Sequence, residues 1–304
     1  MAFIQPGRLF IEQHGDVTSL EDVMGFVEFL RKEARLGVNP PLDLSRIYSR
    51  FNIPAPKLAP LEDQQGLLLD PEQGIVLIKD DDPITRQKFT ECHELIEYLF
   101  SALPEGKGWA TRQAGQFKAI TKEKLCNQGA AELLMPRATF LPRVLELGVS
   151  FQTGRSLAKE YNVSTTAALV QMARLAPGSH AVVLWRMKNK PTEQRSSISP
   201  DQISLFEQTS NELPPKKLRV EWSLASSNAP FIPPDKSVSE STSIYAAWAS
   251  ENFIIGTDNL NLGNTHGQFK CENQPFNNNG ERFVISLLHL PSDTQCPLHN
   301  KLIE

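Results

Sequence analysis

One short segment of the chain carries side chains that can bind a metal ion and move a proton. In TRQKFTECHELIEYLF, residues 85–100, His93 and Glu97 stand four residues apart, so both fall on one face of a helix. An imidazole nitrogen and a carboxylate that converge in this way can hold one divalent ion. Glu94 directly follows His93, in the position of a general base that takes a proton from water. The alternative is an acidic, solvated helix face, because Glu91 lies on the same helix.

The neighbouring segments have the patterns needed to position this helix. A strand is predicted at residues 75–78, and the polar turn DDDP leads from it into the helix predicted at residues 85–100. A second long helix is predicted at residues 121–135, where Pro136 stops it. Upstream, residues 20–36 have the spacing of an amphipathic helix that begins at Ser19, and the stretch LDLSRIYSRFNI predicts a shorter one.

Three blocks of sequence occur in the order found in the ImmA/IrrE family of zinc metallopeptidases. The run IVLIKDDDPITRQKFTECHELIE resembles the family's strand and its AHELGH helix, with HExxE here in place of HExxH. The run EKLCNQGAAELLMP resembles the family's ExxANxFAxxLLMP helix, and LAKEYNVSTTAALVQMARL resembles its LAxxFxVSxxA…RL passage. The LLMP block is the most specific of the three.

This resemblance implies a zinc site with a third ligand. In the family the glutamate that opens the second helix binds the ion, which corresponds to Glu123 here, beside His93 and Glu97 and with Glu94 as the general base. A set of one histidine and two carboxylates neutralises a divalent ion almost completely and lowers its Lewis acidity. Zinc is the cofactor that the resemblance implies. The two carboxylates make manganese more competitive than it is at a site with two histidines.

The four cysteines have spacings that argue against a disulfide framework. Cys92, Cys126, Cys271 and Cys296 lie far apart without a CxxC pair, which favours a reducing, cytoplasmic setting. Cys126 is three residues after Glu123 and is a candidate fourth ligand or a redox-sensitive neighbour of the site. The alternative for Cys126, and for Cys92 before His93, is a small buried residue in place of alanine.

The sequence divides into three parts and predicts an α+β fold. Residues 1–148 are expected to form a mainly helical, zincin-like metallopeptidase domain with a small sheet, and residues 149–178 a helix-turn-helix-like segment. Residues 179–304 are expected to form a C-terminal α+β sensor or docking domain, in line with the GAF-like module of some relatives. Its strands are predicted in AVVLWRM, LRVEWSLA, NFIIGT and RFVISLLHL, its helix in STSIYAAWAS, and separators in stretches such as NKPTEQRSSISP and QPFNNNGE.

Composition and charge weigh against nucleic acid and membrane partners. The net charge is -4 at pH 7 and the isoelectric point is about 5.9, which gives no general attraction to phosphate backbones. In the helix-turn-helix-like stretch the second helix offers only Arg174 as a base-reading cation, so a scaffold or docking function is favoured over DNA readout. The chain begins without the basic and apolar regions of a signal peptide, and no stretch approaches the ~20 apolar residues that cross a bilayer.

The function expected from this sequence is a limited proteolytic cut in one protein partner. The resemblance implies that the partner is a helix-turn-helix transcriptional repressor, whose cleavage relieves repression in a stress or mobile-element response. The alternative is a catalytically inactive family member that acts as a regulatory protein-binding module. The replacement of the second motif histidine by Glu97 supports that alternative.

Overall fold

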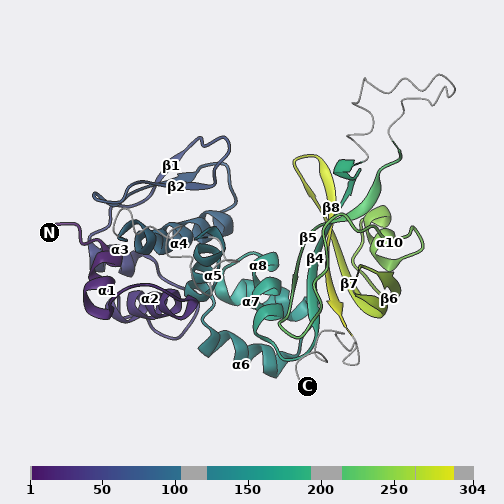
Figure 1. The fold of residues 1–304 in the computed structure, drawn as a ribbon, viewed down its shortest axis with the longest axis horizontal. Helices are drawn as coiled ribbons and strands as arrows, with labels where there is room; N and C mark the ends of the chain where they lie inside the picture. The colour runs from purple at the N-terminus through teal and green to yellow at the C-terminus, as the bar shows by residue number, and fades with distance from the viewer. Residues whose placement is uncertain (1, 104–121, 193–213, 264, 291–304) are drawn as a thin grey trace, which may run out of the picture. The chain divides into compact units, whose positions relative to one another are not determined.

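Helix α4 (Ile84–Ser101) is the central element of the first of two units in the chain. The computed structural model describes residues 2–103, 122–192, 214–263 and 265–290. The first unit comprises Met1–Gly148 and Gln152–Gln171, and the second comprises Val149–Phe151 and Met172–Glu304. Each unit combines helices with one sheet among its described residues, so the predicted α+β class is confirmed (Figure 1).

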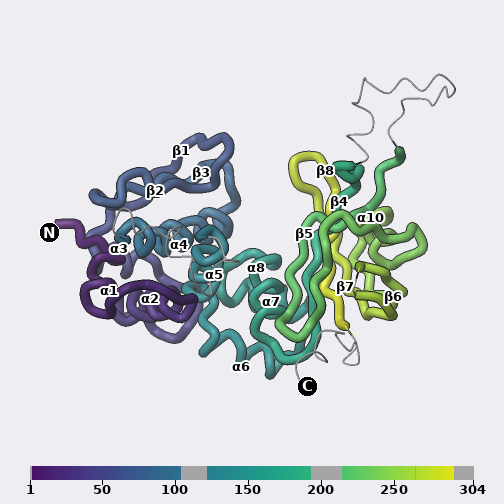
Figure 2. The backbone as a smooth tube through the Cα atoms, in the orientation of Figure 1, coloured from purple at the N-terminus to yellow at the C-terminus, as the bar shows by residue number. Residues whose placement is uncertain are grey.

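Helix α4 packs between a small sheet and several other helices (Figure 2). The sheet has the order β1-β3-β2, with β1 parallel and β2 antiparallel to β3. The strands are β1 (Lys57–Ala59), β2 (Gly66–Asp70) and β3 (Ile75–Lys79). The helices that contact α4 are α1 (Pro6–His14), α2 (Leu20–Glu33) and α5 (Lys122–Leu134), and α5 makes the most extensive contact.

Two of the glycines that pack closely on α4 lie beside its HELIE segment. A Cβ on Gly66 of β2 would lie 2.3 Å from Thr90 Cγ2 and 2.9 Å from Glu94 Oε1, and a Cβ on Gly129 of α5 would lie 2.9 Å from Ile96 Cγ1. Since real Cβ atoms do not approach other atoms so closely, only glycine permits these two contacts. The sheet and α5 therefore reach α4 at the level of the HELIE segment.

The predicted helices of the first unit are confirmed with small shifts at their ends. Helix α2 begins at a capping box in which Ser19 and Asp22 satisfy each other's backbone N–H groups. The shorter helix is α3 (Ser45–Phe51), and the later ones are α6 (Arg137–Leu147), α7 (Phe151–Tyr161) and α8 (Thr165–Leu175). Helix α1 and the strands β1 and β2 were not expected from the sequence.

The second unit is a five-stranded antiparallel sheet in the order β5-β4-β8-β7-β6. Its strands are β4 (His180–Lys188), β5 (Lys217–Ala225), β6 (Ile254–Asn261), β7 (His266–Asn278) and β8 (Glu281–His289). Helix α10 (Ser243–Ser250) packs on β6, β7 and β8 and contributes Ile244 and Ala247 to the core. On the sheet, Trp185, Val220 and Phe269 are among the buried residues of that core.

The prediction that QPFNNNGE separates two elements was wrong. Most of it belongs to β7, which runs to Asn278 and turns directly into β8. Asn279 and Gly280 form the two-residue turn with φ angles of 48° and 77°, which is the left-handed backbone that an Asn-Gly hairpin requires. The other stretch read as a separator, NKPTEQRSSISP, lies outside the described residues from residue 193 onward.

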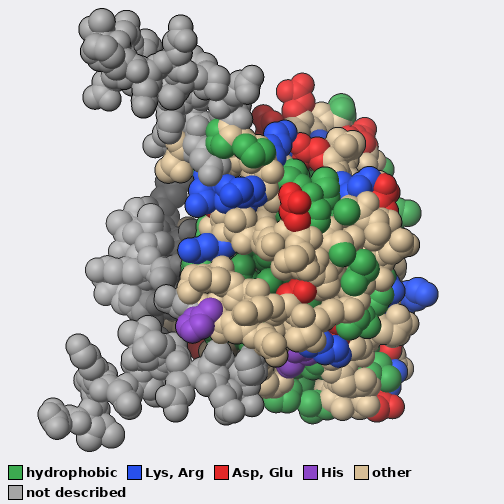
Figure 3. Space-filling model, turned by 90° about the vertical axis from the view of Figure 1, so that its right-hand side faces the viewer, with side chains coloured by type: hydrophobic (Ala, Val, Ile, Leu, Met, Phe, Trp, Pro, Cys, Tyr) green, Lys and Arg blue, Asp and Glu red, His purple; other side chains and the backbone are tan. Residues whose placement is uncertain are grey.

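The described residues show no membrane-spanning helix, and their surface carries charged and apolar side chains together. No helix in the described ranges is long and apolar enough to span a bilayer. The face drawn in Figure 3 mixes acidic, basic and hydrophobic side chains. Basic side chains of β4 are paired with carboxylates, with Arg186 2.6 Å from Glu281 and Lys188 2.7 Å from Glu221 and 2.8 Å from Asp235.

Candidate metal centre

The predicted ligands come together where α4 and α5 cross. His93 Nε2 lies 3.9 Å from Glu97 Oε2 on the same helix and 3.5 Å from Glu123 Oε2 on α5. The side chains of His93 and Glu97 are 13% and 26% exposed, whereas that of Glu123 is 71% exposed. One histidine and two carboxylates therefore face each other at the edge of the helix pair.

Asn127 joins two of these side chains through its amide. Its Oδ1 lies 3.2 Å from His93 Nδ1, and its Nδ2 donates a hydrogen bond of 3.0 Å to Glu123 Oε1. The amide thus occupies one atom of the imidazole and one of the carboxylate. His93 Nε2 and Glu123 Oε2 are the atoms left to face each other.

Lys122 makes a corresponding contact with Glu97. Its ammonium group forms an ion pair with Glu97 Oε1, which leaves Oε2 as the carboxylate oxygen nearer to His93 Nε2. Both carboxylates are therefore held by one oxygen and direct the other toward the imidazole. The lysine also brings a positive charge to the site where a metal ion is expected.

Cys126 of α5 offers a third potential ligand atom near both α4 ligands. His93, Glu97 and Cys126 offer ligand atoms that all lie within 4.8 Å of one another. The thiol is buried, and burial, with the charge of Glu97 adding to it, raises the pKa of Cys126. Glu123 is outside this mutual cluster although it faces His93, so the structure places Cys126 beside the predicted ligands. Cys92 is also buried, and it is outside the cluster.

Glu94 points away from solvent, toward strand β2. Its residue is 4% exposed, and its Oε1 lies in the space left by the missing side chain of Gly66. Burial, reinforced by the charge of Glu97, raises the pKa of Glu94 to about 8, while a hydrogen bond from the backbone N–H of Leu68 acts in the opposite direction. The carboxyl group can therefore gain or lose a proton close to neutral pH.

The donor set fits a divalent ion. Two donors that share a tetrahedral zinc ion, each bonded at about 2.0–2.3 Å, lie roughly 3.3–3.8 Å apart. The separation of 3.5 Å from His93 Nε2 to Glu123 lies within this range, and the 3.9 Å to Glu97 lies just above it. Glu123 is not grouped with His93 and Glu97 among the ligand atoms that all lie within 4.8 Å of one another, so the fit concerns each carboxylate with the imidazole. Imidazole nitrogen and carboxylate oxygen are both ordinary ligands of zinc and manganese.

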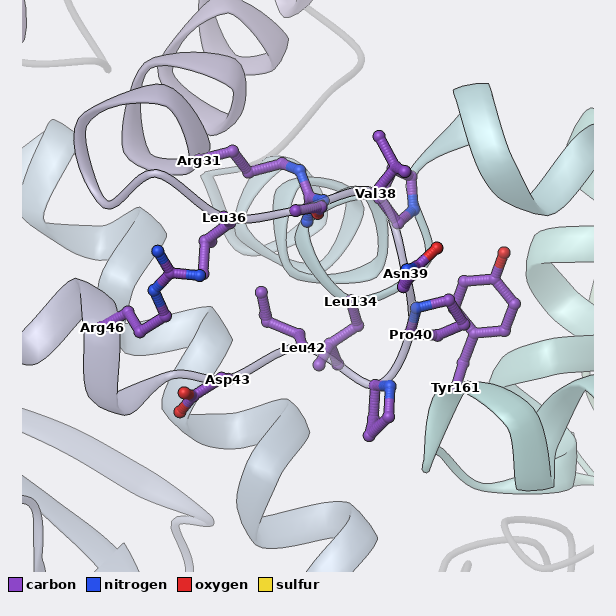
Figure 4. Close-up of a pocket in the computed structure, with 13 residues that line it drawn as sticks. Arg31, Leu36, Val38, Asn39, Pro40, Leu42, Asp43, Arg46, Leu134 and Tyr161 are labelled. Carbon is purple, nitrogen blue, oxygen red and sulfur yellow. The ribbon is translucent and has the colours of Figure 1, made fainter.

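Two hollows elsewhere in the first unit do not include the predicted ligands. A cavity of about 200 Å³ lies between the ends of α2, α5 and α7 and the loop before α3, and Arg31 closes one side by donating to the carbonyls of Leu133 and Gly37 (Figure 4). An open groove of about 640 Å³ runs along α7 to the start of α8. Among the residues that line it are Arg155, Lys159 and, at the start of α4, Thr85.

Sequence reasoning missed Asn127 and Lys122 as parts of the site. Asn127 stands in the ExxAN-like block, four residues after Glu123, and this spacing is the signal that could have identified it. Lys122 precedes Glu123 on a helix with no distinctive pattern there. Only the packing of α5 against α4 brings these two side chains to His93 and Glu97.

Comparisons with known proteins find similarity over part of the chain. Residues 57–172 match the model of a peptidase family described as the IrrE N-terminal-like domain. The radiation response metalloprotease IrrE of Deinococcus deserti is 33% identical over 110 residues, which is 36% of this chain and 39% of that protein. The chain therefore matches about two fifths of the length of this curated relative.

A solved structure matches a larger part of the chain. It is described as a Mycobacterium tuberculosis transcriptional regulator, and it aligns with a TM-score of 0.56 and 13% sequence identity. The alignment covers 94% of this chain and 80% of the other. At this level of identity the likeness concerns the fold, which extends across both units.

Proposed function

Through residues 57–172 the chain belongs to the IrrE N-terminal-like family of peptidases, and from this premise we propose that it is a cytoplasmic metal-dependent endopeptidase. Its substrate is a helix-turn-helix transcriptional repressor, which it cuts at a limited number of bonds. The observation that carries the proposal is the convergence of His93 Nε2 with one oxygen each of Glu97 and Glu123. The remaining polar atom of each side chain is held by Asn127 or Lys122.

The side chains have separate functions in this proposal. His93, Glu97 and Glu123 hold a divalent ion, zinc or manganese, and Cys126 is near enough to complete the set. The bound ion supplies Lewis acidity toward water and the peptide carbonyl. Glu94 accepts the proton of the attacking water and passes it to the leaving amine, for which a pKa near neutral is suited.

The partner is proposed from the relatives. The curated relative is described as a radiation response metalloprotease, which supports a setting in a stress response. The paired cations of β4 and the net charge of -4 favour a protein partner over a nucleic acid. Relief of repression, in a stress or mobile-element response, follows if the cut separates the repressor's DNA-binding and oligomerising parts.

A specific observation favours the second candidate, a regulatory binding module without catalysis. Lys122 already provides Glu97 with a positive partner, and Glu97 itself stands where zinc peptidases have a histidine. A lysine ammonium can neutralise a carboxylate, but it cannot polarise a carbonyl as a metal ion does. In this alternative α4 and α5 are locked by the ion pair and the chain regulates its partner by binding.

The test measures metal content and repressor cleavage on the same preparations. Wild type should contain about one zinc or manganese per chain and cut the repressor. Glu94→Gln should retain the metal and lose cleavage by about 10²–10⁴-fold, because the amide cannot accept the proton. Glu123→Ala should lose metal.

The matched control is Glu91→Gln on the same helix. Glu91 accepts a hydrogen bond of 2.8 Å from the Tyr48 hydroxyl, and an amide oxygen can still accept it. This variant should cut at nearly the wild-type rate. A metal-free wild type, or a Glu94→Gln variant as active as wild type, would overturn the peptidase proposal and leave the binding module.

A further inference from the structure

Asn127 contacts residues of both helices of the candidate centre through the two ends of one amide. Its Oδ1 faces His93 Nδ1 on α4 at 3.2 Å, and its Nδ2 faces Glu123 Oε1 on its own helix at 3.0 Å. The two contacts are not independent, because an amide has one donating and one accepting end. The identity of each end determines what the other can bind.

The hydrogen-bond logic starts at Glu123. A carboxylate oxygen only accepts hydrogen bonds, so the group that faces Glu123 Oε1 must be the amide nitrogen of Asn127. The amide oxygen then necessarily faces His93, and since this oxygen only accepts, His93 Nδ1 must carry a hydrogen. In the neutral imidazole the hydrogen is then absent from Nε2.

The consequence falls on the atoms that face each other. Nε2 is left with its lone pair directed toward Glu97 Oε2 and Glu123 Oε2, at 3.9 and 3.5 Å. The same amide holds Glu123 by its other oxygen, so it fixes the imidazole tautomer and the carboxylate orientation together. The groups that orient metal ligands in this way are commonly carboxylates or backbone carbonyls. Here one amide orients two ligands.

We propose that Asn127 is a positioning residue that sets the His93 tautomer and turns Glu123 Oε2 toward His93 Nε2. One amide thus orients the ligand atoms of two other residues. This inference rests on the proposed function in so far as the presented atoms serve a metal ion. The tautomer itself is a property of the metal-free chain. Asn127 touches neither the substrate nor the reacting water in this proposal.

The first experiment reads the tautomer directly. Nitrogen-15 NMR of the full chain with labelled histidine, recorded metal-free at about pH 9, well above the ordinary histidine pKa, should show His93 with its hydrogen on Nδ1. A His93→Gln sample assigns the signal. In Asn127→Leu, which has a similar size and no polar atom, the signal should move to a mixture of tautomers. Asn127→Asp restores an acceptor and should restore the Nδ1–H form.

The second experiment measures zinc affinity by competition with a chelator. Asn127→Leu should bind zinc about 10–100-fold more weakly than wild type, the usual effect of removing a residue that orients a ligand. Gln128→Leu is the matched control, since Gln128 is the next residue of α5 and has no hydrogen bond to the site within the described residues. It should change the affinity less than twofold.

The two readouts separate the failure of this inference from the failure of the proposed function. A wild-type chain with the hydrogen on Nε2, or an Asn127→Leu variant that keeps the wild-type tautomer, would overturn the inference. Equal zinc affinities of wild type and Asn127→Leu would also overturn it. A wild-type chain that binds no zinc would overturn the proposed function, and the tautomer comparison would still decide whether Asn127 controls His93.

Discussion

Each unit of the molecule contains a network of hydrogen-bonded side chains that joins different elements. The two networks differ in whether their acceptors all have donors. In the second unit Trp185 Nε1 donates to Ser286 Oγ at 3.0 Å, and Ser286 donates to Asn273 Oδ1 at 2.6 Å. Asn273 Nδ2 donates to Ser243 Oγ at 2.9 Å, and Ser243 donates to Asp258 Oδ2 at 2.7 Å. The other oxygen of Asp258 accepts the backbone N–H of Ser243 at 2.8 Å, at the start of α10.

The corresponding arrangement in the first unit leaves acceptors facing one another. Asn127 and Lys122 each hold one oxygen of a carboxylate, and Asn127 holds one nitrogen of His93. With His93 in the proposed tautomer, the remaining atoms of His93, Glu97 and Glu123 are all acceptors. A fully satisfied buried network stabilises a fold, whereas converging acceptors require a cation or a proton between them. This difference distinguishes a structural polar cluster from a candidate binding centre.

The largest expected effect is a loss of stability when the hydrogen-bonded side-chain network of the second unit is broken. Asn273→Leu leaves the buried Ser286 hydroxyl without its acceptor and the half-buried Ser243 Oγ without its donor. The free energy of unfolding should fall by about 2–5 kcal/mol, since each unsatisfied buried polar group costs about 1–3 kcal/mol. Urea unfolding followed by tryptophan fluorescence measures it in a Trp109→Phe background, because the other three tryptophans, Trp185, Trp222 and Trp248, lie in this unit.

The control for this substitution lies on the same strand. Asn277 is exposed near the end of β7, and Asn277→Leu should change the free energy of unfolding by less than about 0.5 kcal/mol. Comparable losses in the two variants would mean that the polar network does not stabilise the second unit, and the contrast between the units would fail.

The pH dependence of stability should have opposite signs at buried carboxylates of the two units. Burial raises the pKa of Glu94 to about 8, so its contribution is fully present below the unfolded value near 4.5 and is lost as the pH rises toward 8. Burial opposes a lowered pKa at Glu272, but hydrogen bonds from His289 and from the Phe151 backbone outweigh it. Its contribution is present above the unfolded value and is lost as the pH falls through the folded one.

These slopes can be measured on the metal-free protein by urea unfolding at a series of pH values. One proton bound differently in the two states changes the free energy of unfolding by up to about 1.4 kcal/mol per pH unit. Helical circular dichroism follows mainly the first unit, and tryptophan fluorescence in the Trp109→Phe background follows the second. Glu94→Gln should flatten the loss between pH 4.5 and 8, and Glu272→Gln the loss in acid. The same slope in wild type and Glu94→Gln would contradict the assignment.

The sequence predicts the elements of the site better than the sheet of the second unit. Helices α4 and α5 have long periodic patterns and, for α5, a proline stop, so both were predicted within a few residues. Strand β7 was missed because its end is rich in asparagine and contains Pro275. That proline lies beyond Asn273, where the pairing of β7 with β6 ends, and it lies opposite Val284 of β8. The Asn279-Gly280 pair was the available signal for the hairpin.

The positions of the candidate ligands follow from spacing, but their shared contacts do not. Helical periodicity places His93 and Glu97 on one face without any knowledge of packing. The approach of Glu123, Asn127 and Lys122 depends on how α5 lies across α4, which Gly129 permits by leaving space for Ile96. No local pattern encodes this crossing, so the contact between Asn127 and His93 and the ion pair between Lys122 and Glu97 could be found only in the structure.

A smaller effect is expected when the motif histidine is restored. Glu97→His replaces a carboxylate by imidazole, which zinc prefers, and removes the partner of Lys122. The variant should bind zinc about tenfold more tightly than wild type, which equals about 1.4 kcal/mol, and its preference for zinc over manganese should increase. Chelator competition with both metals measures this. Gln128→His adds a histidine elsewhere on α5, and an equal gain there would show that the effect is not specific to the site.

The smallest predicted effect is a change in zinc affinity when Lys122 is replaced. Lys122 is the cation that the first unit itself supplies to one of the converging acceptors, Glu97. Lys122→Met removes the positive charge from Glu97 Oε1, so a divalent ion no longer competes with the ammonium group. A partly exposed ion pair contributes about 0–1 kcal/mol, and zinc affinity should therefore rise by about two- to fivefold. The gain should shrink at high salt, because mobile ions screen the repulsion between lysine and metal.

Lys124→Met removes the same charge from the same helix without touching the Glu97 pair, and it should leave the affinity nearly unchanged. Equal affinities of the two variants would mean that Lys122 does not oppose the ion. A zinc site that appears in Lys122→Met but is absent from wild type would instead favour the binding module over the peptidase.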